Sequence, residues 1–188
     1  MSAREYKQIA KSKIKGHWGK FALLFFVETL IIMFVAGSGV MTLLSFLIVG
    51  PLQLGYIGCV LDFSRGEKFK TANLFDGFDN FVTSFVLQLL CGLFTFLWSL
   101  LLIVPGIIAF YSYSMSFYIL KDNPNLKANE ARNRSIALMH GHKWQLFCLH
   151  FSFIGWILLS ILTLGILLIW IMPYIELATA EFYENIKK

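Results

Sequence analysis

The sequence predicts an all-α integral membrane protein with six transmembrane helices, arranged as three repeated helical hairpins with cytoplasmic amphipathic lead helices. The composition supports this prediction: 57% of the 188 residues are hydrophobic and 14% are charged, whereas a soluble domain has about a quarter charged residues. Three apolar blocks, at 18–61, 81–120 and 144–183, are each long enough for two crossings of a bilayer. They show no alternation typical of strands, so helices are expected to satisfy the backbone in lipid.

Each apolar block opens and closes in a similar way, which predicts a threefold repeat within one membrane domain. The opening aromatic pairs are Trp18 with Phe21, Phe78 with Phe81 and Trp144 with Phe147, and the prolines that follow are Pro51, Pro105 and Pro173. The repeat units are expected at about 1–64, 65–121 and 122–188. The first spans are expected at 18–36, 78–96 and 144–162, and the second spans at about 40–62, 97–121 and 165–184.

The first lead, residues 3–15, is amphipathic at helical spacing. Its apolar stripe is Ala3, Tyr6, Ala10 and Ile14, and its basic stripe is Arg4, Lys7, Lys11 and Lys15. This pattern suits a helix on the anionic inner leaflet, where each basic residue contributes about 1 kcal/mol. The alternative is that these charges only set the topology of the first span.

The turns between paired spans are expected at Gly37–Gly39, Thr95–Trp98 and Thr163–Gly165. None of these tips contains Lys or Arg, although the chain has 16 such residues and a formal net charge of +5. The positive-inside rule therefore places both termini and both long loops in the cytoplasm. Because the basic residues flank apolar spans and do not cover a folded surface, nucleic acid is not an expected partner.

The three prolines Pro51, Pro105 and Pro173 allow two interpretations. A proline inside a span removes one backbone hydrogen bond and kinks the helix, which would leave room at the centre of the bundle. Alternatively, each proline starts a new helix after a short break. Pro105, which Gly106 follows, is the preferred site of a true break.

Four polar residues within the apolar blocks form a candidate intramembrane layer: Glu28, Gln88, His150 and Glu176. Glu28 and Gln88 lie at equivalent depths in two units, and Glu176 follows Pro173 by less than one turn. Ionisable groups at such depth are costly, so they indicate a functional site by default. The competing interpretation is interhelical hydrogen bonding that only fixes the packing.

The sequence shows no pattern that predicts an enzyme, a cofactor or a metal site. Cys59, Cys91 and Cys148 fall inside apolar blocks and are expected to pack as small hydrophobic residues. His140 and His142 are two apart and do not share a helix face. Phosphate-binding, nucleophile and zinc motifs are absent from the sequence.

Several motifs in fixed order resemble the DUF975 family of bacterial integral membrane proteins, a family of unknown function. They are Val104–Ala109, Tyr111–Met115, Tyr118–Pro124, Met139–Trp144, Phe151–Trp156, Pro173–Tyr174, Phe182–Tyr183 and Lys15–Trp18. The chain is also distantly similar to the membrane domains that precede some bacterial glycerophosphodiesterases. The resemblance implies a polytopic bacterial membrane protein and supplies no catalytic residues.

These observations together predict a non-enzymatic binding, scaffold or accessory component of the bacterial cytoplasmic membrane. Its expected partners are anionic lipids of the inner leaflet, and either another membrane protein or a second copy of the chain. The alternative is a small transporter or channel built on the polar layer. A lipid-handling enzyme is a third hypothesis, which rests only on the distant similarity.

Overall fold

The computed structural model describes residues 2–36, 41–67, 70–163 and 165–187, and all regular structure in these ranges is helical. This confirms the all-α class. The elements are α1 (Ala3–Ile14), α2 (Trp18–Ala36), α3 (Met41–Ser64), the 3-10 helix η1 (Thr71–Asn80), α4 (Phe81–Leu101), α5 (Ile103–Tyr113), α6 (Ser116–Asp122), α7 (Ala128–Leu138), α8 (Lys143–Phe151), α9 (Ile154–Leu162) and α10 (Leu168–Ile186).

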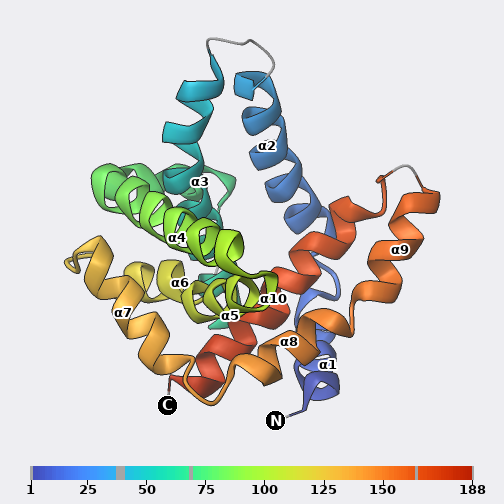
Figure 1. Ribbon diagram of the computed structural model, residues 1–188. Helices are drawn as coiled ribbons and strands as arrows, with labels where there is room; N and C mark the ends of the chain where they lie inside the picture. The colour runs from blue at the N-terminus through green and yellow to red at the C-terminus, as the bar shows by residue number, and fades with distance from the viewer. Residues whose placement is uncertain (1, 37–40, 68–69, 164, 188) are drawn as a thin grey trace.

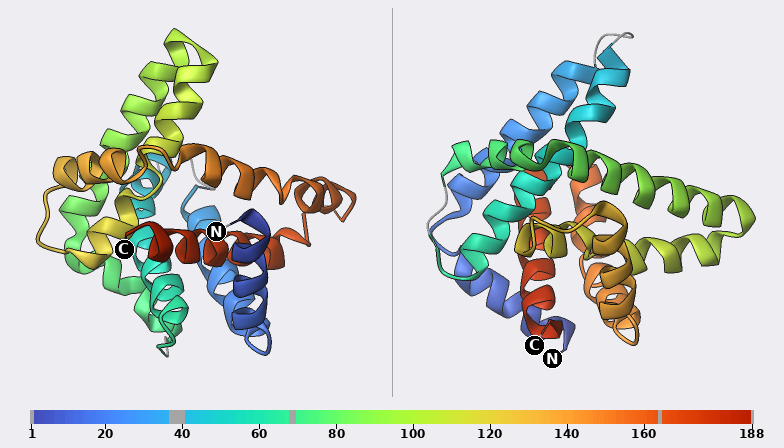
Figure 2. Two further views of the ribbon diagram at one scale, coloured as in Figure 1. Left: turned by 90° about the horizontal axis from the view of Figure 1, so that it is seen from below. Right: turned by 90° about the vertical axis from the view of Figure 1, so that its left-hand side faces the viewer.

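Three pairs of helices extend from a common centre in different directions. In Figure 1, α2 and α3 rise to the top while α9 and the start of α10 extend to the right. The right-hand view of Figure 2 shows α4 and α5 projecting sideways as a third pair. The centre, where α6 and α10 cross the second half of α3, contains the buried apolar core.

Four stretches of helix in the described ranges are long and apolar enough to cross a membrane: Leu47–Ser64, Thr71–Leu101, Ile103–Asp122 and Lys143–Leu162. A fifth results if α1 and the first part of α2, which meet at a bend of 99°, are counted as one broken span. The structure therefore contains several helices suited to a membrane. The number of six crossings stays a prediction.

The predicted span 18–36 coincides with α2, but the predicted turn at Thr95–Trp98 is wrong. Helix α4 continues to Leu101, and the chain turns at Leu102, whose φ of −161° and ψ of 146° are extended. The polar side chains near Thr95 do not break the helix, because the Ser99 hydroxyl donates to the Thr95 carbonyl at 2.8 Å. The predicted tip Gly37–Gly39 lies outside the described residues, as does Leu164 in the third tip.

The three prolines do not share one role. Pro51 and Pro173 lie inside α3 and α10, whereas Pro105 lies in the first turn of α5. An N–H is not needed in the first turn, so Pro105 fits the start of a helix. Beside Pro51, η1 packs so closely on α3 that a Cβ at Gly77 would overlap the Pro51 carbonyl oxygen.

The predicted span 144–162 corresponds to the apolar stretch Lys143–Leu162, but the helix is interrupted within it and divides into α8 and α9. Phe153 lies at the break, fully buried, with its ring 5.0 Å from the ring of Tyr174. From α1, Lys7 donates to the Ser152 carbonyl at 3.0 Å, and its ammonium lies 4.3 Å from the centre of the Phe153 ring. These contacts hold a bend that would otherwise leave a carbonyl unpaired.

Helix α1 exists as predicted, but protein covers its apolar stripe. Tyr6, Ala10 and Ile14 are buried, and the Tyr6 ring lies 5.5 Å from Phe182 of α10. Burial of this stripe ties the N-terminal helix to the last helix. Arg4 and Lys11 stay exposed on α1, and so does Lys15 directly after its end, so a contact with the membrane surface would involve the basic stripe alone.

Candidate functional site: a polar cavity at the helix junction

A cavity of about 530 Å³ lies where the helix pairs meet. Its walls combine polar side chains from α3, α4, α8 and α10 with aromatic side chains from α4, α5 and α6. The lining residues are Gln53, Ile57, Gln88, Cys91, Gly92, Thr95, Phe96, Ser99, Phe110, Tyr113, Ser114, Phe117, Tyr118, His150, Ile175, Glu176 and Thr179. The volume lies within the roughly 300–1,000 Å³ of small-molecule sites.

Glu176 and Tyr118 form one hydrogen-bonded pair in this cavity. The Tyr118 hydroxyl donates to Glu176 Oε2 at 3.1 Å, which joins α6 to α10. Tyr118 is only 2% exposed, so its hydroxyl depends on this bond. Among the described residues, no Lys or Arg side chain pairs with Glu176.

His150 and Thr179 form the second pair, with His150 Nε2 lying 3.2 Å from the Thr179 hydroxyl oxygen. The Thr179 hydroxyl donates its own proton to the Ile175 carbonyl at 2.9 Å. Nε2 must therefore carry the proton that completes the bond, so this imidazole nitrogen acts as a donor. Thr179 lies one turn after Glu176 on α10, so the two pairs share one helix face.

Gln88 lies where α4 crosses α3. Its Oε1 is buried and has no hydrogen-bond partner among the described residues. A Cβ on Gly50 would lie 2.8 Å from this oxygen, so the absence of a side chain at Gly50 allows the close approach. Gln53, one turn further along α3, is exposed and lines the cavity.

Glu28 does not line the cavity. It is half-buried on α2, close enough to Glu176 for the two acidic groups to influence each other. Tyr56 of α3 has a buried hydroxyl without a hydrogen-bond partner among the described residues. Of the four residues in the predicted polar layer, three line one cavity, and the fourth, Glu28, lies outside its lining. Their joint function stays a prediction.

Most residues of the cavity were not among the predicted site residues, including Gln53, Tyr118 and Thr179. Gln53 carried a usable signal, since it is a polar residue two positions after Pro51 in an apolar block. Thr179 is spaced three residues from Glu176, which places both on one helix face. Tyr118 carried no such signal, because a tyrosine near the end of an apolar block resembles an interfacial residue.

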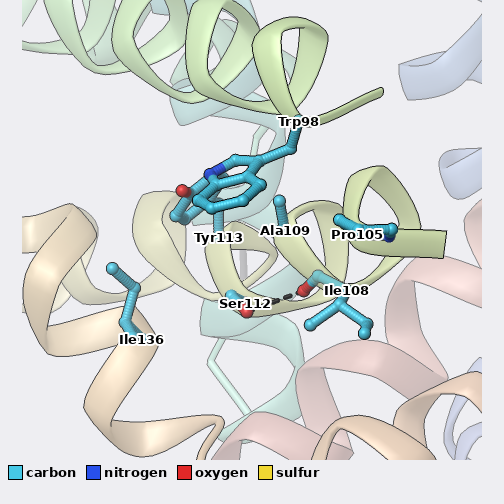
Figure 3. A pocket seen from close by; sticks show the side chains of 7 residues that line it. All are labelled: Trp98, Pro105, Ile108, Ala109, Ser112, Tyr113 and Ile136. Atoms are coloured by element: carbon cyan, nitrogen blue, oxygen red, sulfur yellow. Dashed lines mark hydrogen bonds between the residues drawn. The ribbon is translucent and has the colours of Figure 1, made fainter. Parts of the chain in front are cut away.

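A second cavity, of about 250 Å³, lies between the α4–α5 pair and α7, and its lining includes Trp98 and Tyr113 (Figure 3). Its lining is almost wholly apolar. The hydroxyl of Ser112 donates to the Ile108 carbonyl at 2.7 Å and is satisfied within α5. The Tyr113 ring separates this cavity from the polar one, because Tyr113 lines both.

An ion-paired cluster joins the ends of α3, α6 and α10 on the side where both termini lie (Figure 1). Arg65 Nη2 lies 2.5 Å from Asp122 Oδ1 and 2.8 Å from Glu184 Oε1. Burial alone would lower the pKa of the Arg65 guanidinium, but the two carboxylates outweigh burial and raise that pKa. Lys187 also contacts Asp122 and Glu184, at 3.2 and 2.8 Å.

Two tyrosines in ring contact, Tyr118 and Tyr183, lie between this cluster and the cavity. The Tyr183 hydroxyl donates to Asp122 Oδ2 at 2.8 Å, and the Tyr183 ring lies 5.3 Å from that of Tyr118. None of the residues in the ion-paired cluster lines the cavity. Within the ranges that the structure describes, no three His, Cys, Asp or Glu side chains gather in a way that would hold a metal ion.

The fold and the cavity define an all-α protein with several helices that are long and apolar enough to cross a membrane. The chain belongs to the family described as "Protein of unknown function (DUF975)", which it matches over residues 1–112 and 100–188. The family resemblance is thus confirmed, while the similarity to glycerophosphodiesterase membrane domains stays a prediction. No match was found among curated proteins or among solved structures.

Proposed function

We propose that this chain is a non-enzymatic, multi-pass membrane protein that binds a small molecule or a lipid group in the polar cavity. The observation that carries the proposal is the polar lining at a junction of helices whose outer faces are apolar. Large apolar side chains stay exposed on α2, α4, α5 and α9, with Leu101 at 69% and Leu162 at 83% near two helix ends. Such extensive apolar exposure suits contact with lipid.

The proposed topology has six crossings as three hairpins, with both termini and both long loops in the cytoplasm of a bacterium. Support comes from the ion-paired cluster, which gathers the ends of α3, α6 and α10 beside the N-terminal helix. In Figure 1 both termini lie on this side, and α2 and α3 extend to the opposite side. The distribution of Lys and Arg along the sequence favours the same orientation.

Anionic lipids of the inner leaflet are the proposed partners of the basic stripe on α1. Arg4 and Lys11 on that helix and Lys15 directly after it are exposed. Each contributes about 1 kcal/mol of attraction near an anionic surface. The exposed apolar faces of the helix pairs also suit a scaffold role, in which another membrane protein or a second copy replaces lipid.

A small transporter or channel is the alternative function, favoured by Glu28 and Glu176 near the helix junction. It receives less support, because Tyr118 and Tyr183 lie between the cavity and the ion-paired cluster. A transporter would require this pair of rings to separate. Flux of a solute that depends on Glu176 in proteoliposomes would favour the transporter over the binding protein.

The cavity itself is tested by filling it. Gly92 lines the cavity and has open space where a Cβ would stand, so Gly92→Phe should enter the cavity without a backbone clash. Gly155 on α9 is equally open but lies away from the cavity, and Gly155→Phe is the matched control. Each protein is extracted in polymer nanodiscs without detergent, and bound molecules are identified by native mass spectrometry.

We expect a bound species in the wild type and in Gly155→Phe that is absent from Gly92→Phe. The physical reason is direct displacement by the phenyl ring. Equal occupancy in all three proteins would contradict the proposed cavity, as would the absence of any bound species. Thermal unfolding of each variant verifies that the loss does not reflect misfolding.

A further inference from the structure

We propose that the polar cavity takes an organic ammonium group, with Glu176 as its counter-ion and aromatic rings around it. This inference rests on the proposed binding function and adds the chemical class of the ligand.

The charge of the cavity is the first argument. Glu176 is the one carboxyl group among the lining residues that the structure describes, and that lining contains no Lys or Arg. Tyr118 uses Glu176 Oε2, and no described residue donates to Oε1. A carboxylate in such a site is costly unless a positive charge compensates it. In the described structure no side chain does so. Without a cation the acid takes up a proton instead, so a cationic ligand is what would hold Glu176 in its charged form.

Neighbouring groups strengthen the preference for a cation. Glu28 is a second acidic residue near Glu176, and it brings no positive charge to this region. His150 forms no ion pair with Glu176 in the described structure, and its Nε2 proton is directed to the Thr179 hydroxyl. A phosphate or a carboxylate ligand would meet repulsion from Glu176. The field therefore selects cations over anions.

The aromatic lining selects an organic cation. Phe96, Phe110 and Phe117 line the cavity together with Tyr113 and Tyr118. Ring faces attract ammonium groups, above all alkylated ones, which lose little hydration on entering an apolar site. A bare metal ion would need several oxygen or nitrogen ligands at close range, and the described lining offers a single carboxyl group. The combination of one carboxylate and several rings suits an alkylammonium.

The amide side chains add acceptors. Gln88 Oε1 is buried without a partner among the described residues, and Gln53 is exposed at the same cavity. A primary ammonium could donate to such oxygens, whereas a quaternary one would contact only the rings and Glu176. The shared chemistry is the ammonium itself, which a lipid head group or a soluble amine can supply.

The test compares choline with 3,3-dimethyl-1-butanol, which has the same shape but carbon in place of the charged nitrogen. Binding is measured by equilibrium dialysis with the full chain in nanodiscs of phosphatidylglycerol alone. We expect choline to bind at least about tenfold more tightly than the neutral alcohol. Glu176→Gln should abolish this preference, while Glu130→Gln, an exposed acid on α7, should retain it.

A second set of nanodiscs contains phosphatidylethanolamine. If this lipid competes with choline, the ammonium belongs to a lipid head group; if it does not, a soluble amine is the ligand. Equal affinity of the wild type for choline and the alcohol, or no binding of choline, would overturn the ammonium assignment. Should Glu176→Gln fail to fold, loss of choline binding in Gly92→Phe and its retention in Gly155→Phe take its place.

The two proposals fail in different ways. If choline does not bind but Gly92→Phe still loses the co-purified species, the ligand class is wrong and the binding function stands. If Gly92→Phe retains that species and choline does not bind, both proposals are overturned.

Discussion

Arg65 and Asp122 connect the end of α3 to the end of α6 through a contact of 2.5 Å, although 57 residues separate them in the sequence. Glu184 of α10 contacts the same guanidinium, at 2.8 Å. Three second spans of the proposed repeat thus end at one arginine. The charged residues of the connecting segments therefore do more than set topology, because they hold the helix pairs together at their base.

Replacement of this arginine should loosen the base of the fold. Arg65→Gln removes the charge that faces Asp122 and Glu184, and leaves two partly buried carboxylates close together near Lys187. We expect the free energy of unfolding to fall by about 1–2 kcal/mol, since these side chains are only partly shielded from water. The measurement is thermal unfolding in nanodiscs.

The control for this variant is Arg134→Gln, an exposed arginine on α7 for which no ion pair is described. Its free energy of unfolding should lie within about 0.5 kcal/mol of that of the wild type. Equal stability of Arg65→Gln and the control would show that the cluster contributes nothing measurable. High salt should narrow the difference between the two variants, because it screens the remaining exposed pairs.

A second prediction concerns the close contact of η1 with α3. A Cβ on Gly55 would overlap the Leu74 carbonyl, and one on Gly77 would overlap that of Pro51. Since both obstacles are backbone atoms, neither can move aside by rotating a side chain. We expect Gly55→Ala and Gly77→Ala each to cost more than about 2 kcal/mol, through overpacking, as measured by folded yield and thermal unfolding.

Matched glycines on the exposed helix faces should behave in the opposite way. At Gly92 and Gly155 no atom lies within 4 Å of the position that a Cβ would take. In a helix interior alanine is favoured over glycine by up to about 1 kcal/mol. Gly92→Ala and Gly155→Ala should therefore be neutral or stabilising. If all four alanine variants unfolded alike, the proposed contact between η1 and α3 would be absent in the membrane.

Local patterns in the sequence predicted the parts of the fold that depend on local causes. The bounds of α2 follow from an apolar run that begins at Trp18, and the amphipathic stripe of α1 follows from its spacing. The break between α8 and α9 was missed because its contacts come from Lys7, 145 residues away in the sequence. The turn at Leu102 was missed because the Ser99 hydroxyl is satisfied within the helix, by the Thr95 carbonyl.

The candidate site shows the same division. Polarity within an apolar block was enough to select Gln88, His150 and Glu176, which the structure places around one cavity. Their partners could not be predicted, because Tyr118 and Thr179 have ordinary functions in apolar helices and become significant only through the crossing of α6, α8 and α10. The equivalent depth of Glu28 and Gln88 did not predict that Glu28 lies outside the cavity.

A third prediction separates packing from function in the Tyr118–Glu176 pair. Tyr118→Phe removes the hydroxyl that donates to Glu176. Glu176→Gln replaces the carboxyl group that accepts this bond with a neutral amide. If the bond contributes to folding, each single substitution should lower the free energy of unfolding by about 1–2 kcal/mol. The double substitution should then lower it by about 1 kcal/mol less than the sum of the two single effects. The double-mutant cycle is measured by thermal unfolding.

Additive losses in this cycle would contradict a direct interaction between the two side chains. Tyr111→Phe is the control, because its ring packs on His150 at 5.8 Å while no hydrogen bond of its hydroxyl is described. That variant should show no coupling with Glu176→Gln. Retained ligand occupancy in Tyr118→Phe would show that the pair serves mainly to position α6 against α10.

The last prediction concerns the orientation of the chain in the membrane. Ser12 on α1 is exposed, and so is Leu162 near the end of α9, at 83%. Single cysteines at these positions, in a chain with Cys59, Cys91 and Cys148 replaced by alanine, report which side each faces. We expect Ser12→Cys to react with a membrane-impermeant maleimide only after the cells are permeabilised, because the basic lead remains inside.

Leu162→Cys should react in intact cells if the tip of α9 reaches the outer surface. Protection of this cysteine on both sides would indicate that the α8–α9 segment enters the bilayer without crossing it. Labelling of Ser12→Cys in intact cells would overturn the proposed orientation.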